Sequence, residues 1–197
     1  MTKLSAEGGG MRIIAGQFRG RKLFSPIKSG IRPTTDAVRE SIFNILYSAS
    51  GLLPEPEYQN ILDLFAGTGA MGLEALSRNA ARALFVDNNP EAHAIIYKNI
   101  AMLGVADHAK IYRRSALKLD QWRELYRFNM VFVDPPYYKN CVKPALLSAE
   151  KSGWLDHNAV IVCETASDET LELPSAFKES KVRIYGRTKI AVYVYKP

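Results

Sequence analysis

The chain has 197 residues, of which 47% are hydrophobic, and its 26 Lys and Arg against 20 Asp and Glu give a formal net charge of +6. This length suits one α/β domain with a small extension, and no apolar run reaches the roughly 20 residues of a membrane-spanning helix. The two cysteines, Cys141 and Cys163, form no CxxC pair and the three histidines are scattered. The sequence therefore predicts a cytoplasmic protein with neither a disulfide framework nor a metal site.

The N-terminal part is basic. Residues 1–10 lack the apolar stretch of a secretory signal and are expected to form a flexible tail. From Met11 to Pro33 the chain has no acidic residue and six basic ones: Arg12, Arg19, Arg21, Lys22, Lys28 and Arg32. Strand-like pieces at 12–15 and 22–24, with Phe18 and Phe24 among the charges, would suit phosphate contact and base stacking. A solvated hairpin whose charges discourage strand aggregation would have the same composition, so both interpretations stay open.

The next segment predicts a helix that starts near Asp36, where a Thr or Asp side chain can cap the first turn. Apolar residues follow at helical spacing: Val38, Ile42, Ile45, Leu46 and Ala49. A loop at 51–56 ends this helix. We expect three parts: the tail 1–10, a basic hairpin and helix at 11–56, and the main domain at 57–197.

From Ile61 onward, short apolar runs alternate with helical patterns. Strands are expected at 61–65, 83–86, 110–112, 130–133 and 160–163, and helices at 71–78, 90–103, 117–125 and 144–151. Residues 182–185 and 190–195, separated by Gly186-Arg187, predict a final β-hairpin. Such a series gives a Rossmann-like α/β fold, with a seven-stranded, mostly parallel sheet, a C-terminal antiparallel hairpin and a small N-terminal extension.

A glycine-rich loop follows the first expected strand. Residues 67–72 read Gly-Thr-Gly-Ala-Met-Gly, and Asp87 ends the next strand, where a carboxylate can accept hydrogen bonds from ribose hydroxyls. This pattern alone allows an NAD-type site or an S-adenosylmethionine site. Asp63 favours the second, because a carboxylate at the loop would repel a pyrophosphate and attract the ammonium of a methionyl group.

The second motif is Asp134-Pro135-Pro136-Tyr137, directly after the strand at 130–133. In the expected strand order this strand neighbours the one at 61–65, so the motif would face the cofactor. The exocyclic nitrogen of guanine or adenine is a poor nucleophile, because its lone pair is delocalised into the ring. The Asp134 carboxylate and the Pro135 carbonyl would hold its N–H groups, and the two prolines would stiffen the turn. The Tyr137 ring would stack on the base, which contributes about 1–3 kcal/mol. The motif predicts a direct, proximity-aided methyl transfer to an amino nitrogen.

The runs 63–69 and 134–137 together resemble the class I S-adenosylmethionine-dependent methyltransferases that act on amino nitrogens. More narrowly, the chain is similar to the bacterial 16S rRNA guanine-N2 methyltransferases that modify guanine 966. This similarity is carried by residues 12–23, 32–36, 38–40, 43–44, 72–78 and 131–136. It extends from Arg12 to the end, with Ala37 as a departure where an Arg is expected.

The resemblance implies roles for individual residues. S-adenosyl-L-methionine, released as S-adenosyl-L-homocysteine, would be bound by Asp63, Phe65, Ala66, Gly67, Thr68, Gly69, Asp87, Asn88, Ser115, Ala116 and Asn44. Asp134, Pro135, Pro136 and Tyr137 would present the base, and Arg12, Arg19, Arg21, Lys22 and Arg32 would contact 16S rRNA. No metal is implied. The implied enzyme is a monomer that methylates guanine N2 within the small ribosomal subunit.

Several alternatives remain. The same chemistry could act on another RNA, on DNA adenine N6 or on a protein glutamine, although the protein enzymes usually have Asn where this chain has Asp134. A non-catalytic RNA-binding protein or an NAD-dependent oxidoreductase would leave residues 134–137 unexplained. Glu164 is predicted to be a sheet-end charge rather than a substrate contact, and Trp122 and Trp154 to be packing residues rather than base stackers. Tyr138 and Lys139 are either RNA contacts or exposed loop residues.

Overall fold

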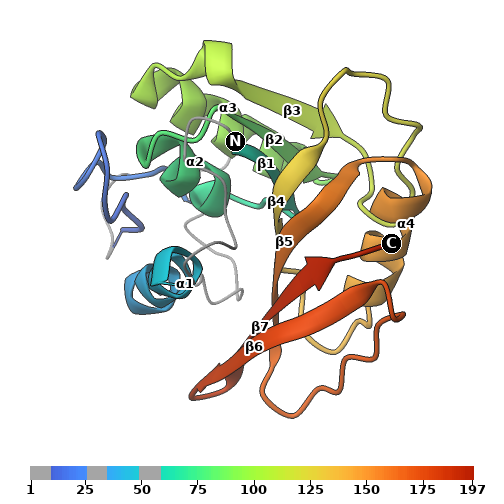
Figure 1. Cartoon of the computed structure of the whole chain (residues 1–197). Coiled ribbons are helices and arrows are strands. Elements are labelled where there is room, and N and C mark those ends of the chain that lie inside the picture. Colours follow the sequence, from blue (N-terminus) through green and yellow to red (C-terminus); the bar gives the residue numbers. More distant parts are fainter. Residues whose placement is uncertain (1–9, 26–34, 49–58) are drawn as a thin grey trace.

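The structure is a computed structural model that describes residues 10–25, 35–48 and 59–197. Within these residues, seven strands form one sheet in the order β3-β2-β1-β4-β5-β7-β6 (Figure 1). The strands are β1 Asn60–Leu64, β2 Arg82–Asp87, β3 Ala109–Arg113, β4 Phe128–Val133, β5 Leu155–Ala166, β6 Phe177–Tyr185 and β7 Thr188–Tyr195. The pairs among β1 to β5 are parallel, whereas β7 is antiparallel to both β5 and β6. The predicted Rossmann-like α/β sheet with its terminal hairpin is confirmed.

Helices cover both faces of the sheet, as Figure 1 shows. They are α1 Asp36–Ser48, α2 Ala70–Ser77, α3 Pro90–Leu103 and α4 Val142–Lys151, with a short 3-10 turn η2 at Ala106–His108. Residues of α1, α2 and α3 pack in one buried cluster with Ile61, Phe85 and Phe132. Residues of α4 pack in a second cluster with Leu62, Leu64 and other strand residues. Successive residues of β1 therefore point to opposite faces of the sheet, and both faces are apolar.

The bounds of α3 follow from its terminal residues. The Asn89 side chain accepts a hydrogen bond from the Glu91 N–H (2.9 Å), and Pro90 occupies the first turn. Gly104 ends the helix in the left-handed conformation. The predicted start and end of this helix are confirmed.

The predicted helix at 117–125 is wrong, because no helix forms between β3 and β4. The backbone of this segment is instead bound to α4 and the turn after it. The Leu119 N–H donates to Ser148 Oγ (2.8 Å), Ser152 Oγ donates to the Leu119 carbonyl (3.0 Å), and the Trp122 N–H donates to the Ser152 carbonyl (2.9 Å). The ring of Trp122 packs against that of Trp154, with centroids 4.6 Å apart, so both tryptophans are packing residues as predicted.

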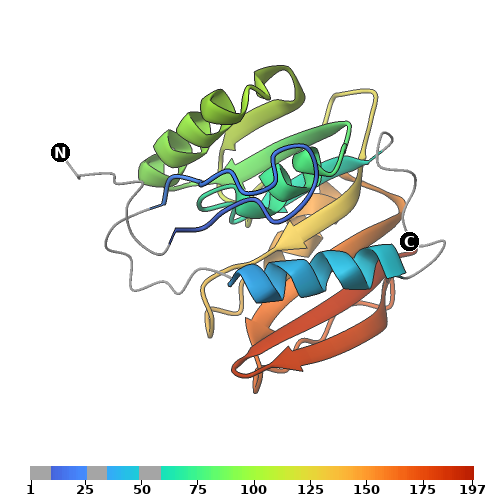
Figure 2. The ribbon, with the colours of Figure 1, turned by 90° about the vertical axis from the view of Figure 1, so that its left-hand side faces the viewer.

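Residues 10–25 form a loop that lies over α2, between α3 and α1 (Figure 2). The predicted strands at 12–15 and 22–24 meet at a single antiparallel bridge, Arg12 with Lys22. Backbone hydrogen bonds from the Ile13 N–H to Arg21 (2.9 Å) and from the Leu23 N–H to Met11 (2.8 Å) flank this bridge. The Ile14 and Ala15 N–H groups donate to the carboxylate of Glu74, at 2.7 and 3.0 Å. Glu74 is fully buried in α2 and also accepts from Arg78 Nε (2.9 Å).

The tail 1–9, Arg32 and the loop 51–56 lie outside the described residues. The division of the chain at residue 57 therefore stays a prediction. In the part of the chain that the structure describes, no helix is long and apolar enough to cross a membrane.

The contacts of Glu74 lead to a stability prediction. Glu74→Ala leaves two backbone N–H groups and Arg78 without their acceptor, which should lower the free energy of unfolding by about 3–5 kcal/mol. Urea unfolding measures this change, and hydrogen exchange at Ile14 and Ala15 should accelerate. The control Glu40→Ala removes an exposed acid of α1 and should stay within about 0.5 kcal/mol of the wild type. Equal stability of both variants would contradict the account.

Candidate active site

The two motifs of the sequence leave the sheet at the same edge. β1 and β4 are parallel neighbours, with Leu64 paired to Val133. The glycine loop follows β1 directly and Asp134 follows β4, so both start at the carboxyl ends of adjacent strands. The predicted adjacency of the two motifs is confirmed, and ligands of open α/β sheets bind at such an edge.

The glycine loop turns tightly from β1 into α2. Phe65 and Gly69 both have positive φ angles, 59° and 77°, and Gly69 precedes the first residue of α2. The Gly69 N–H donates to the Ala66 carbonyl (2.7 Å). Gly72 lies against the next strand, because a Cβ there would be 2.4 Å from Phe85 Cε1. The glycines thus allow α2 to approach β2 closely.

Asp63 is a buried carboxylate beneath this loop. Asp63 is 3% exposed, and its Oδ2 accepts a hydrogen bond from the Gly72 N–H (3.0 Å). Burial raises the pKa of Asp63 to about 7, and the charge of Asp87 adds to this shift, while the Gly72 N–H opposes it. A carboxyl group whose pKa lies near neutral pH suits a cationic ligand group, because the charge of that group would favour the ionised form of the carboxyl.

The carboxylate of Asp87 connects the glycine loop with the start of α3 through hydrogen bonds. Its Oδ2 accepts from the Gly67 N–H (2.9 Å) and its Oδ1 from the Asn89 N–H (2.8 Å). Its backbone carbonyl is 2.6 Å from Nε2 of the buried His93. The carboxylate of Asp87 is therefore fixed at the end of β2.

Residues after β3 complete this edge. Asp87 pairs with Arg113 across the β2–β3 ladder, so the turn at Ser115 and the buried Ala116 follows the neighbouring strand. The Ser115 carbonyl accepts from the Lys118 N–H (3.0 Å). Asn44, in contrast, is exposed on α1, and no described contact joins it to the glycine loop.

The Asp-Pro-Pro-Tyr turn is held by the phenol of Tyr137. Asp134 is half-buried and Pro135 is buried. The Tyr137 hydroxyl donates to Glu164 Oε1 (2.7 Å) and lies 2.9 Å from Thr188 Oγ1. Burial, with the nearby carboxylates, raises the pKa of Tyr137 well above its ordinary value, so this phenol stays protonated. Its described contacts suit a fixed ring rather than an acid or base.

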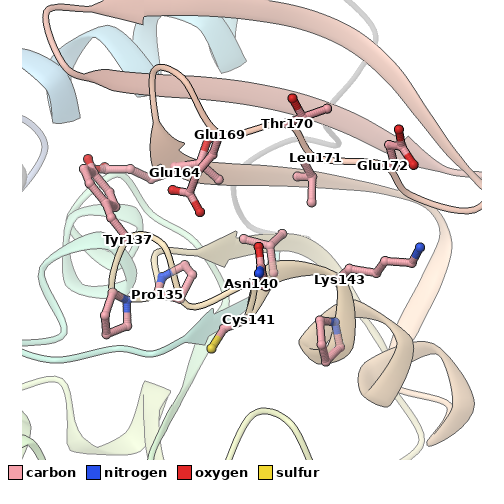
Figure 3. A pocket seen from close by; sticks show the side chains of 14 residues that line it. Pro135, Tyr137, Asn140, Cys141, Lys143, Glu164, Glu169, Thr170, Leu171 and Glu172 are labelled. Atoms are coloured by element: carbon pink, nitrogen blue, oxygen red, sulfur yellow. The ribbon is translucent and has the colours of Figure 1, made fainter.

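A hollow of about 460 Å³ opens beside this turn, between the start of α4 and the segment 164–172 (Figure 3). In Figure 3, Tyr137 lies next to Glu164 at one end of the hollow, and Lys143 lies on α4 at the other. Glu164 and Glu169 are among the residues that line the hollow. Glu164 is therefore more than the predicted sheet-end charge, because it receives the Tyr137 hydroxyl.

The basic N-terminal segment contacts the glycine loop. Met11 Sδ accepts from Thr68 Oγ1 (3.2 Å). Asn99 of α3 donates from its Nδ2 to the carbonyls of both Thr68 (3.0 Å) and Phe24 (3.1 Å). The predicted RNA-contacting residues in this segment are all exposed: Arg12, Arg19, Arg21 and Lys22. Arg12 also pairs with Asp36, at 2.9 Å.

Sequence reasoning missed two buried polar residues that position these loops, Glu74 and Asn99, and it did not foresee the bond of Glu164 to Tyr137. Asn99 carries the clearest signal, because it interrupts the apolar stripe of Ile95, Ile96, Ile100 and Leu103. A polar residue within a buried helix face needs hydrogen-bond partners. Such a signal shows that a partner exists, without showing which one.

Comparison with known proteins gives consistent matches. The family model described as conserved hypothetical protein 95 matches residues 11–194. Ribosomal RNA small subunit methyltransferase D of Escherichia coli (strain K12) is 36% identical over 195 residues, covering 98% of this chain and 94% of the relative. A solved Escherichia coli structure is 33% identical with a TM-score of 0.78, covering 95% and 99% of the two chains. An RNA methyltransferase from Salinibacter ruber, solved in complex with S-adenosyl-L-homocysteine, shares the fold at 14% identity and a TM-score of 0.62, covering 84% of this chain and 94% of that chain.

The pKa of Asp63 leads to a pH-dependent stability. Because the folded-state value of about 7 exceeds the ordinary 3.8, the folded protein holds this proton more tightly than the unfolded chain. The resulting stabilisation is fully present below about pH 4 and is lost as the pH rises to about 7, by up to about 4 kcal/mol. Asp63→Asn cannot titrate, so its unfolding free energy should lack this decline. Parallel pH profiles of the two proteins in urea unfolding would contradict the prediction.

Proposed function

The chain belongs to the family of the ribosomal RNA small subunit methyltransferases D, described by its family model as conserved hypothetical protein 95; on this premise we propose that it methylates the exocyclic N2 of a guanine in 16S rRNA. The observation that carries the chemistry is the parallel pairing of β1 with β4, which sets the glycine loop beside Asp134–Tyr137. The choice of guanine N2 is supported by the resemblance in residues 12–23 and 131–136. The proposed substrate is the small ribosomal subunit, and the proposed active form is a cytoplasmic monomer.

The residues around the glycine loop fit S-adenosylmethionine. When bound, this cofactor supplies an electrophilic methyl group on a positively charged sulfur. Asp63 would hold its ammonium group and Asp87 its ribose hydroxyls, while residues 65–69 would line the methionyl part. Asn88, Ser115 and Ala116 would surround the adenine. The buried Asp63 carboxyl supports this assignment, because a cation there would offset the cost of ionising it.

The Asp-Pro-Pro-Tyr turn would present the base. The Asp134 carboxylate and the Pro135 carbonyl would each accept an N–H of the target amino group and keep its nitrogen pointed at the methyl group. The Tyr137 ring would stack on the base, and its hydrogen-bonded hydroxyl keeps that ring in place. Asp134 needs no strongly raised basicity, since the nitrogen can lose its proton after the methyl group arrives. The rate would come mainly from positioning.

The segment 10–25 and α1 would form the part of the chain that contacts RNA. Arg19, Arg21 and Lys22 are exposed on this segment, so their charges can reach phosphates. Phe18 packs against the hydrophobic core, so phosphate contact rather than stacking on this ring is the proposed use of the segment.

The proposed mechanism predicts the effect of removing the Asp134 carboxylate. Asp134→Ala should lower methyl transfer to unmodified small ribosomal subunits at least about 100- to 1000-fold, because one positioned acceptor is lost. Binding of S-adenosylhomocysteine, measured by calorimetry, should change less than about threefold. The control Asp107→Ala removes an exposed carboxylate after α3, near the opposite edge of the sheet, and should keep full activity. Full activity of Asp134→Ala would contradict the proposed mechanism.

A second prediction concerns the exposed charges of the segment 10–25. Replacing Arg19, Arg21 and Lys22 by Gln should weaken RNA binding and lower the slope of log affinity against log salt by about 2, since each phosphate contact to a single strand contributes about 0.7. Binding is measured at several salt concentrations. The control replaces Arg123, Arg127 and Lys151, three exposed charges near the amino-terminal end of β4 or the end of α4, and should leave the slope unchanged. If the salt slope of the Arg19, Arg21 and Lys22 variant were unchanged, the segment would have a structural role and no role in RNA binding.

A further inference from the structure

Tyr138 follows the Asp-Pro-Pro-Tyr turn and has an unusual backbone. Its φ angle is 59°, in the left-handed region that bulky side chains rarely adopt. The residue is nevertheless 65% exposed, so burial of the ring does not explain the conformation. Backbone strain of this kind persists where surrounding contacts impose it, and it is common at binding sites.

The contacts that impose it come from the segment after β5. The Tyr138 N–H donates to Glu169 Oε1 (3.1 Å), and the second oxygen of Glu169 accepts from the Ala166 N–H (2.9 Å). The Tyr138 hydroxyl donates to Asp168 Oδ1 (3.1 Å). Tyr138 is thus held at its backbone and at the tip of its side chain, with the ring exposed between these two points.

The ring of Tyr138 is perpendicular to that of Tyr137. The two planes meet at 89°, with centroids 6.4 Å apart. A flat base that stacks on Tyr137 therefore cannot stack on Tyr138 as well, so the second ring would need a different base.

Exposed cations lie in the segments that meet here. Lys139 is the next residue, and Arg187 is in the β6–β7 turn, where its carbonyl accepts from the Ser167 N–H (3.0 Å). Both side chains are exposed, as contacts to RNA phosphates require.

We propose that Tyr138 is a stacking platform for a nucleobase adjacent to the target base, with Lys139 and Arg187 contacting the phosphates of that nucleotide. This inference rests on the proposed function, because it assumes that Tyr137 receives the base to be methylated. A base taken out of its stack leaves a neighbour with an uncovered face, and an exposed aromatic ring can cover it. Tyr138 would act as a positioning residue, since it touches the flanking nucleotide and not the reacting atoms.

Ring removal is the first test. Tyr138→Ala should raise the KM for small ribosomal subunits about tenfold while kcat stays within about twofold, because stacking contributes to binding in the ground state and the transition state alike. Tyr138→Phe keeps the ring and loses only the bond to Asp168, so its KM should stay within about threefold. Tyr97→Ala, which removes a similarly exposed tyrosine from α3, should leave KM unchanged. Unaltered binding of S-adenosylhomocysteine shows that each variant is folded.

A base-deletion experiment identifies the stacked nucleotide. The probes are short single-stranded RNAs with one guanine, in which the nucleotides on either side are replaced one at a time by an abasic residue. Loss of one particular flanking base should weaken wild-type binding about tenfold and leave binding by Tyr138→Ala unchanged. Equal weakening of both proteins by every abasic RNA, or a wild-type KM in Tyr138→Ala, would overturn the stacking role alone. Failure of the wild type to methylate any RNA would instead overturn the proposed function, and this inference with it.

Discussion

The parallel pairing of β1 with β4 joins two loops that are far apart in the sequence. Leu64 and Val133 are paired at the ends of these strands, so the chain leaves both strands side by side. Each strand is buried on both faces, and a slip by one residue would exchange the residues that pack on α1–α3 with those that pack on α4. The apolar core thus enforces the register, and the register places Asp63 and Asp134 at one edge.

Buried polar side chains attach the outer parts of the site to this core. Glu74 binds the backbone of the basic segment, and Glu164 binds the hydroxyl of Tyr137. Asn99 bonds to Phe24 of that segment and to Thr68 of the glycine loop, so the two are linked through one side chain. Hydrogen bonds of this kind are directional, and a buried polar group left without a partner is costly. They therefore add directional constraints to the burial of Ile13 and Leu23, which holds the basic segment against the core.

The sequence predicted the elements and motifs whose signals are local. The apolar strands and the glycine loop depend on near neighbours in the chain, and the adjacency of the two motifs followed from the strand order expected of such folds. The false helix at 117–125 shows the limit, because tertiary hydrogen bonds with Ser152 engage the Leu119 carbonyl and the Trp122 N–H, which a helix would have paired internally. The positive φ angle of Tyr138 could not be predicted from the neighbouring sequence, because it depends on a hydrogen bond to Glu169, which lies in the loop after β5.

The central claim is that this edge of the sheet delivers a methyl group to guanine N2 of 16S rRNA. The most direct measurement is the identity of the nucleoside formed when the protein, labelled S-adenosylmethionine and unmodified small ribosomal subunits react, with naked 16S rRNA and duplex DNA in parallel. Mass analysis should find N2-methylguanosine in the subunits or the rRNA. Label in DNA adenine alone would keep the chemistry and contradict the substrate, and no label in any nucleic acid, despite cofactor binding, would contradict the account itself.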